Sequence, residues 1–579
     1  MITAIEIKSR TPFVGGVSFG SVGAYERIDG VAIGEIDPAL PANRGIVNID
    51  KAPRNARGQV EYRSDICILR PADAEKGNGR ILYEVNNRGR IMLFANLCAG
   101  KVGNQPQAAD DLGNALPLRR GFTLVWSGWD PGAPRANGGL GLEAPTATNN
   151  GAPIVRRIRE EFISGTRGGD LTQFRLSYEV ASRDDAVLTV RRVQTATRRP
   201  VAFEFVDART VRLAHGLPEP GSIYELRYHA TQPRVLGIGF AATRDIVSHL
   251  RNHAEGRDLL GRRPTHALAF GISQAGRYLR DHLAQGFNHD ESGARIFDGV
   301  YTHVAGIGRV FFNTEFGQPA RTRTWHEDHD FPEIEYPFAT AAGDAKVIET
   351  NTSTEYWQKG ASLLHTDGAS DAALPPNLRG YLIAGTQHGG KAGMPRDAGP
   401  CINPRNWHDP MPAVRALLIA LDEWVANGRE PPPSRLPRID DGTLVRAEQV
   451  AWPKVPGLVP PRAANDVVAL DDWTDPKTPL QAWQALVPQV DTDGNELGGI
   501  RLPDIAVPTG MFTGWNLYKA PMPEGELADR EGTYLAFSTE RYPSKDAYVT
   551  RVQEVVHALL ADRLLLEEDA GAYLKRALA

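Results

Sequence analysis

Short runs of apolar residues alternate along the middle of the chain with stretches whose apolar positions repeat at helical spacing. The apolar runs are nearly continuous, are bounded by turn residues, and occupy residues 80–85, 121–129, 265–271, 297–306, 345–352 and 379–385. Helical stretches lie at residues 239–256, 274–287, 355–365 and 410–428. Strands that are apolar throughout are typical of a parallel sheet covered by helices on both faces. The pattern therefore predicts an α/β fold with a mostly parallel, doubly wound sheet.

Segments outside this alternation divide the chain into regions. Residues 1–78 are a β-rich segment of short strands and turns, which we expect to pack on the core. The core spans residues 79–430 and is interrupted at about 137–233 by a β-rich insertion that could form a cap. After a proline-rich stretch, residues 431–579 combine short strands with a final helical part. We expect this C-terminal extension to pack back on the core.

Composition and charge argue against several classes of protein. The chain has 579 residues, 41% of them hydrophobic, and its net charge of −5 does not favour a nucleic-acid partner. The cysteines Cys67, Cys98 and Cys401 form no CxxC pair, which disfavours a zinc ribbon or a disulfide framework. The first residues lack the features of a signal peptide, and no apolar run approaches the length of about 18 residues that a membrane span needs. We expect a cytoplasmic protein without a metal or other cofactor; its oligomeric state stays open.

The stretch AFGISQAGRYLR, residues 269–280, places a serine between a predicted strand and a predicted helix. Ser273 has small residues on both sides, among them Gly271 and Ala275. This pattern is close to G-x-S-x-G, the nucleophile elbow in which a tight turn lifts the hydroxyl above the sheet. The backbone N–H of Gln274 would then face an oxyanion. The pentapeptide alone also fits an ordinary serine in a glycine-rich turn, and the strand and helix around it favour the nucleophile.

A base and an acid for this serine follow in the order expected for α/β-hydrolases, which is nucleophile, acid, histidine. His388 stands in a glycine-flanked loop three residues past a predicted strand. Glu355 lies just beyond the preceding strand, where its carboxylate could accept the Nδ1–H of the imidazole. A simpler role for Glu355 is that of a carboxylate in the first turn of a helix. Asp367 or Asp371 is the alternative acid.

Other polar clusters have simpler interpretations. His249 and His282 fall on predicted helix surfaces. His326 and His329, in WHEDHD, lack the H-E-x-x-H spacing of a zinc site, so we interpret them as solvated loop residues. The stretch DTDGNE lacks the complete spacing of an EF-hand loop and fits a hairpin turn with Gly494 at positive φ. None of these clusters predicts a metal site.

The loop NNRGR, which follows the first apolar run of the core, is where we expect a second oxyanion donor. The backbone N–H of Asn87 or Arg88 could act together with the N–H after the serine. Trp129 lies at the end of a predicted strand and could contact an apolar or aromatic acyl group. Trp515 and Asn516 could form a pocket wall supplied by the C-terminal extension. Packing of the extension against the core is the alternative for these two residues.

Together these motifs resemble the α/β-hydrolase superfamily. More closely, the chain is similar to the large bacterial "alpha/beta hydrolase domain-containing" proteins, a family regarded as serine esterases. The matching stretches span nearly the whole chain and include GAYERIDGVAIGEIDP, LYEVNNRG, GISQAGRYLR, YLIAGTQHGG and DTDGNELGGIRLPDIAVPTG. The resemblance implies the hydrolase fold, with Ser273, Glu355 and His388 as a catalytic triad. It adds little about the substrate.

The sequence thus predicts a serine hydrolase that cleaves a small-molecule carboxylic ester through an acyl-enzyme. The same triad would also serve an acyltransferase, a lactonase or an amidase, and the sequence does not separate these activities. A non-catalytic protein of this fold that binds a small ligand is the alternative from another class. The acyl and alcohol parts of the substrate, and whether the insertion acts as a lid, stay open.

Overall fold

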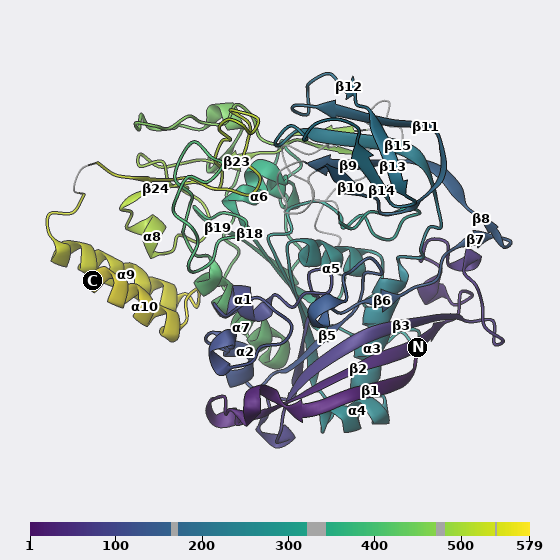
Figure 1. The fold of residues 1–579 in the computed structure, drawn as a ribbon. Helices are drawn as coiled ribbons and strands as arrows, with labels where there is room; N and C mark the ends of the chain where they lie inside the picture. Colours follow the sequence, from purple (N-terminus) through teal and green to yellow (C-terminus); the bar gives the residue numbers. More distant parts are fainter. Residues whose placement is uncertain (164–171, 321–342, 470–480, 539–540) are drawn as a thin grey trace.

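Six parallel strands form the central part of this computed structural model (Figure 1), which describes residues 1–163, 172–320, 343–469, 481–538 and 541–579. In space they run in the order β5-β4-β16-β17-β18-β19. Each lies within or overlaps one of the six apolar runs that predicted strands, which confirms those predictions. The strands are β4 (Arg80–Glu84), β5 (Thr123–Ser127), β16 (His266–Ile272), β17 (Gly299–His303), β18 (Lys346–Thr352) and β19 (Leu378–Ile383).

The N-terminal region extends this sheet instead of only packing on it. β3 pairs antiparallel with β5, β2 with β3, and β1 with β2, which brings the sheet, with the short β6, to ten strands. β3 can join the sheet because Ile66 and Ile68 on it are buried in the same core as the parallel strands. No break in the sheet therefore separates the first 78 residues from the core. The added strands are β1 (Ile2–Pro12), β2 (Tyr25–Ile36), β3 (Val60–Pro71) and β6 (Leu142–Glu143).

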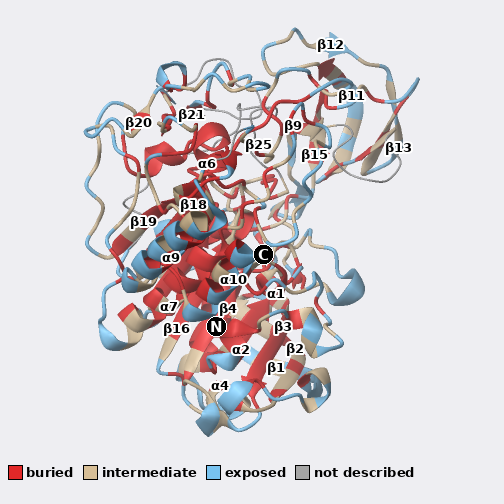
Figure 2. Ribbon diagram, turned by 90° about the vertical axis from the view of Figure 1, so that its left-hand side faces the viewer, coloured by how far each residue is buried: buried red, intermediate tan, exposed pale blue. Residues whose placement is uncertain are grey.

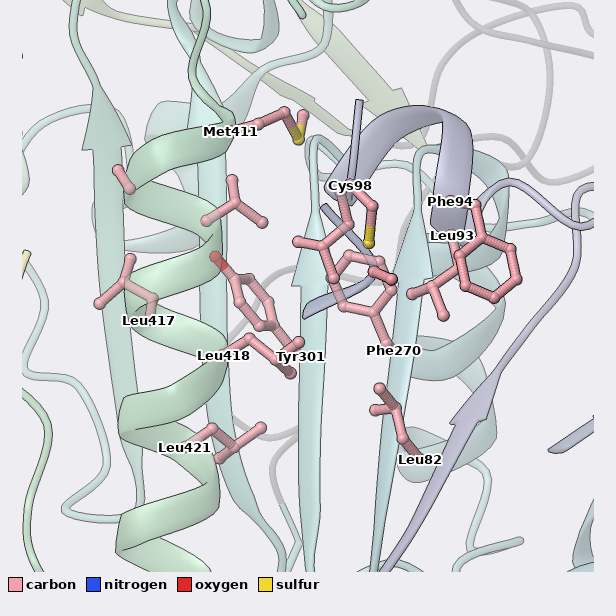
Figure 3. Close-up of a cluster of buried hydrophobic side chains, with 14 of the residues drawn as sticks. Leu82, Leu93, Phe94, Cys98, Phe270, Tyr301, Met411, Leu417, Leu418 and Leu421 are labelled. Carbon is pink, nitrogen blue, oxygen red and sulfur yellow. The ribbon is translucent and has the colours of Figure 1, made fainter. Parts of the chain in front are cut away.

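Helices cover both faces of the parallel strands. Side chains alternate in direction along a strand, so Ala269 of β16 packs in the cluster of α3 and α5, and its neighbour Phe270 packs in the cluster of α1 and α7. Figure 3 shows Phe270 and Tyr301 in the second cluster, beside Leu418 of α7. The helices around the sheet are α1 (Leu93–Leu97), α2 (Leu116–Arg119), α3 (Ile238–Asn252), α4 (Ala254–Leu260), α5 (Gln274–Ala284), α6 (Ser353–Gln358) and α7 (Met411–Asn427).

Besides the short antiparallel pair β7-β8, the predicted insertion contains two larger antiparallel sheets outside the central one, ordered β12-β11-β15-β9 and β10-β14-β13 (Figure 1). They enclose a core of their own, to which Tyr178, Leu226 and Tyr228 belong. Phe316, from the segment after β17, packs into the same core and so connects the insertion to the parallel strands. Its strands are β7 (Thr148–Asn149), β8 (Ala152–Pro153), β9 (Val155–Ile163), β10 (Gln173–Arg175), β11 (Glu179–Arg191), β12 (Arg199–Pro200), β13 (Phe203–Asp207), β14 (Thr210–Leu213) and β15 (Ile223–Thr231).

The C-terminal extension packs against the core along two stretches. Its last two helices bury Leu559 and Tyr573 in the cluster that contains α7, and Ile500 pairs with the end of β19 through Ile383. Figure 2 shows buried residues concentrated around the central strands and α6. The elements of the extension are β20 (Leu444–Val445), β21 (Val467–Ala469), β22 (Gln481–Trp483), β23 (Val487–Pro488), α8 (Pro503–Ala506), β24 (Gly510–Phe512), β25 (Tyr534–Ala536), α9 (Lys545–Ala561) and α10 (Glu567–Leu578).

Among the described residues, none of the helices combines the length and the apolar character needed to cross a bilayer.

Candidate active site

Ser273 occupies the tight turn between β16 and α5. Its backbone has φ 58° and ψ −115°, a conformation that residues other than glycine rarely adopt. The turn is closed so tightly that a Cβ at Gly271 would lie 2.5 Å from the carbonyl oxygen of Ala275. The N–H of Ser273 donates to the carbonyl of His303 at 2.7 Å. Local geometry therefore explains the glycine at 271, while a methyl group is accommodated at 275.

The three predicted triad residues lie in hydrogen-bond contact. Ser273 Oγ is 2.9 Å from His388 Nε2, and His388 Nδ1 is 2.5 Å from Glu355 Oε1. The N–H of His388 donates to Thr354 Oγ1 at 3.1 Å, which ties the histidine loop to the start of α6. The structure thus brings together side chains that follow three strands of the parallel sheet, β16, β18 and β19.

Glu355 makes both of the contacts that the sequence left open, one with the helix start and one with the imidazole of His388. It lies in the first turn of α6 and forms a capping box with Thr352, the residue before the helix. Glu355 Oε2 accepts the N–H of Thr352 at 3.0 Å and also the hydroxyl of that residue. Its other oxygen, Oε1, remains for His388. The cap orients the carboxylate before it meets the imidazole.

The protonation states suit a base and its acid partner. Burial by itself would raise the pKa of Glu355, but the charge of His388 and the hydrogen bonds from His388 and Thr352 outweigh it and hold the pKa below its ordinary value. Burial lowers the pKa of His388, and the Glu355 carboxylate opposes that effect only in part. At neutral pH the site therefore holds an ionised Glu355 and a neutral His388 able to accept a proton.

The fold of the chain agrees with a comparison with known families. A family model described as "Alpha/beta hydrolase domain" matches residues 178–575. The chain belongs to the alpha/beta hydrolase family. Ser273, Glu355 and His388 all fall inside the matched range, and so does most of the C-terminal extension. The resemblance predicted from the sequence motifs is thereby confirmed at the level of the family. No curated protein matches the chain.

The alternative acids of this hydrolase domain do not reach the histidine. Asp367 accepts the N–H groups of Ala369 at 2.8 Å and Ser370 at 2.6 Å, which closes its own turn. Asp371 accepts the N–H of Ile439 at 3.1 Å, from the C-terminal extension. Both carboxylates therefore stabilise turns, and Glu355 is the acid in contact with His388.

The three backbone N–H groups expected to bind an oxyanion differ in their hydrogen bonds. The N–H of Gln274 lies at the start of α5 and has no hydrogen-bond partner among the described residues. The N–H of Asn87 donates to the carbonyl of Arg90 at 2.9 Å, and that of Arg88 donates to the carbonyl of Asn86 at 3.0 Å. The prediction for Asn87 and Arg88 is thus wrong in this structure, because the loop folds back and uses both N–H groups itself.

The two tryptophans predicted to line a substrate pocket are buried in the core. Trp129 is 0% exposed and donates from Nε1 to the carbonyl of Asn86 at 2.8 Å, and its ring lies 4.7 Å from that of Tyr278. Trp515 is 0% exposed and packs in the cluster of Trp357. These two tryptophans therefore fill the core, which contradicts the acyl contact predicted for Trp129 and the pocket wall predicted for Trp515.

Asn516 takes part in the same packing of the extension on the core. It is 0% exposed, and its side-chain amide donates to the carbonyl of Asn403 at 3.0 Å and of Gly532 at 3.1 Å. Both donors of the amide group are thus used within the protein. The packing alternative, and not a pocket wall, describes Asn516.

Several other sequence predictions can be compared with the structure. Gly494 has φ 79° in the hairpin turn, as predicted. His249 and His282 are 5% and 0% exposed, so their placement on helix surfaces is wrong, because α3 and α5 are covered by further segments. His326 and His329 lie outside the described residues. Within the described ranges, no three His, Cys, Asp or Glu side chains gather to hold a metal ion.

Two buried groups beside the triad were not predicted from the sequence. His303, at the end of β17, is 0% exposed and bonds through Nδ1 to Thr350 Oγ1 at 2.8 Å. Lys359 is 6% exposed, and burial together with the positive charges of Arg277 and Arg530 lowers its pKa to about 8. The position of His303 at the end of an apolar run is the one signal that could have drawn attention to it. Nothing in the pattern around Lys359 distinguishes it from a surface lysine.

Proposed function

We propose that this protein is a serine hydrolase that cleaves a carboxylic ester. The observation that carries the proposal is the continuous chain of contacts from Ser273 Oγ to His388 Nε2, at 2.9 Å, and from His388 Nδ1 to Glu355 Oε1, at 2.5 Å. A serine hydroxyl is a weak nucleophile unless a neighbouring base removes its proton. The neutral His388 supports that role for the base.

In the first half of the reaction, Ser273 Oγ attacks the carbonyl carbon of the ester while His388 Nε2 takes the hydroxyl proton. Glu355 accepts the Nδ1–H, holds the imidazole in the required tautomer, and stabilises the imidazolium that forms. The N–H of Gln274 points from the start of α5, where the helix dipole also favours negative charge. It is the donor that we assign to the oxyanion.

The tetrahedral intermediate formed by this attack then collapses, and the acyl-enzyme is hydrolysed. His388 returns its proton to the leaving alcohol, whose oxygen departs from the carbonyl carbon and leaves the acyl group on Ser273. A water molecule then gives its proton to His388 and attacks the acyl-enzyme. The bond between the carbonyl carbon and Ser273 Oγ then breaks, His388 Nε2 gives its proton to Oγ, and the carboxylic acid leaves.

The test is labelling of the folded protein with a fluorophosphonate, followed by peptide mass mapping. We expect an adduct on Ser273 and turnover of a p-nitrophenyl ester. Ser273→Ala should abolish both and leave the circular dichroism spectrum unchanged, because the side chain projects from the turn without a packing role. Ester hydrolysis at the wild-type rate in Ser273→Ala, or a folded wild-type protein without any adduct, would show that Ser273 is not the nucleophile.

A further inference from the structure

A carboxyl group from the C-terminal extension lies between the start of α6, which carries Glu355, and the loop that carries His388. Glu496 is 4% exposed. Its Oε2 accepts a hydrogen bond from the hydroxyl of Ser353 at 2.5 Å and another from the N–H of Gly385 at 2.8 Å. A single oxygen atom thus bonds to two separate segments of the core.

These two segments hold the acid and the base of the proposed triad. Ser353 is the first residue of α6 and precedes Glu355 by two positions. Gly385 lies just past β19 and precedes His388 by three positions. β18 and β19 pair along their length, but this backbone pairing ends at Thr352 and Ile383. Beyond that point, the distance between the start of α6 and the histidine loop depends on contacts such as those of Glu496.

A neighbouring stretch of the extension packs into the same junction. The hydroxyl of Thr354 donates to the carbonyl of Gly514 at 2.6 Å and accepts the N–H of His388 at 3.1 Å. Gly514 approaches α6 so closely that a Cβ built on it would lie 2.3 Å from the Cβ of Ser353. The junction is therefore closely packed, and a shift of the start of α6 would also displace the histidine loop.

We propose that Glu496 is a positioning residue that holds the Glu355 carboxylate at the correct distance from His388. The inference rests on the proposed function, because without an activated serine there is no triad to position. The side chain of Glu496 bonds to Ser353 and Gly385 and to none of the three proposed triad residues. It acts through the start of α6 and the loop after β19, to which its Oε2 is bonded.

The expected effect on the rate follows from how strongly catalysis depends on the positions of the reacting groups. A displacement of about 1 Å can lower the rate about 10²-fold. Burial raises the pKa of Glu496 to about 7, so a substantial fraction of the carboxyl is neutral near neutral pH. Glutamine presents a carbonyl oxygen in the same place and can accept both hydrogen bonds, whereas alanine can accept neither.

The test compares variants of the full chain by the rate of fluorophosphonate labelling at Ser273 and by kcat and KM for a p-nitrophenyl ester. For Glu496→Ala we expect labelling and kcat to fall about 10- to 100-fold with little change in KM. Glu496→Gln should stay within about threefold of the wild type, because it keeps both bonds. Asp569→Ala removes another buried carboxylate, from α10, and should keep the wild-type labelling rate at a temperature where it is folded.

A double-mutant cycle separates positioning from a general loosening of the fold. Glu355→Gln keeps the helix cap but lacks the acid, so Glu496→Ala should slow labelling in this background by less than about threefold. A wild-type labelling rate in Glu496→Ala would overturn the inference. The inference would also be overturned if Glu496→Ala lowered the labelling rate by the same factor in the wild type and in Glu355→Gln.

Ser353→Ala keeps the inference testable if Glu496→Ala does not fold. It removes one of the two donors to Glu496, and we expect labelling to slow about fivefold, an effect that also disappears in the Glu355→Gln background. An unchanged rate in Ser353→Ala would then overturn the inference. A wild-type protein without an adduct on Ser273 would instead overturn the proposed function, and the positioning role with it.

Discussion

Glu355 divides its two carboxylate oxygens between the helix cap and the imidazole. Oε2 accepts the N–H of Thr352 at 3.0 Å, and Oε1 lies 2.5 Å from His388 Nδ1. A short bond to an ionised carboxylate is stronger than one between neutral groups. The carboxylate therefore remains ionised although its residue is 0% exposed, because burial is outweighed by these partners. The reactivity proposed for Ser273 therefore depends on whether the imidazole of His388 is neutral.

The pH dependence of kcat/KM should report that imidazole. His388 must be neutral to act as a base, so activity is lost as the pH falls through its pKa. Because burial lowers this pKa from 6.5, we expect the midpoint of the acidic limb below pH 6.5. The profile is measured with a p-nitrophenyl ester at constant ionic strength.

Glu355→Gln serves as the matched variant for this pH profile. The Glu355 carboxylate raises the pKa of His388, so its removal should move the residual acidic limb to still lower pH. A wild-type midpoint above pH 6.5 would contradict a buried, neutral base. A limb that moves upward in Glu355→Gln would do the same.

At the scale of elements, α6 is held from two directions. On the side of β18, Thr352 caps its N-terminus and forms a capping box with Glu355. On the other side, Gly514 of the C-terminal extension approaches so closely that a Cβ there would lie 2.3 Å from the Cβ of Ser353 and from the N of Thr354. A closely packed helix start leaves Glu355 little freedom to move. The C-terminal extension therefore helps to hold the candidate site in place.

Gly514→Ala should disturb this contact. The added methyl group must displace either α6 or the extension, so we expect a decrease of about 1–3 kcal/mol in the free energy of unfolding and a lower kcat. Urea unfolding and ester turnover measure the two effects. Gly571→Ala is the matched control, because a Cβ there meets nothing within 4 Å and the residue lies in α10. That control should be neutral or slightly stabilising, and an equally stable, equally active Gly514→Ala would show that the approach is not tight.

At the scale of the whole molecule, the extension and the parallel strands share one core. Leu559 of α9 and Tyr573 of α10 pack in the cluster of Leu417 from α7. Arg415 of α7 and Asp569 of α10 form a buried ion pair with bonds of 2.5 and 3.0 Å. The last two helices are thus attached by apolar packing and by ion pairs, of which this one is buried.

Asp569→Ala should separate stability from activity. Removing one partner leaves the Arg415 guanidinium buried without its carboxylate, which typically costs about 3–5 kcal/mol. We expect a clear fall in the midpoint of thermal unfolding, measured by circular dichroism. Labelling of Ser273 at a temperature well below that midpoint should stay at the wild-type rate. A selective decrease of labelling in protein that remains folded would indicate that the pair acts on the site itself.

The sequence by itself determined the parallel strands and the order of Ser273, Glu355 and His388 along them. Apolar periodicity and turn residues are local properties, and residues that follow parallel strands of one sheet are brought to the same edge of it. The hairpin turn at Gly494 was predictable for the same reason, because positive φ is a local requirement.

Only the tertiary structure decided which side chains are covered and which hydrogen-bonding groups remain open. Trp129 and Trp515 end in the core because distant segments pack over them, and the N–H of Asn87 is used within its own loop. Glu496 meets Ser353 although 143 positions separate them in the chain. Burial and hydrogen-bond partners arise from segments far apart in the sequence, so no local pattern around a residue contains them.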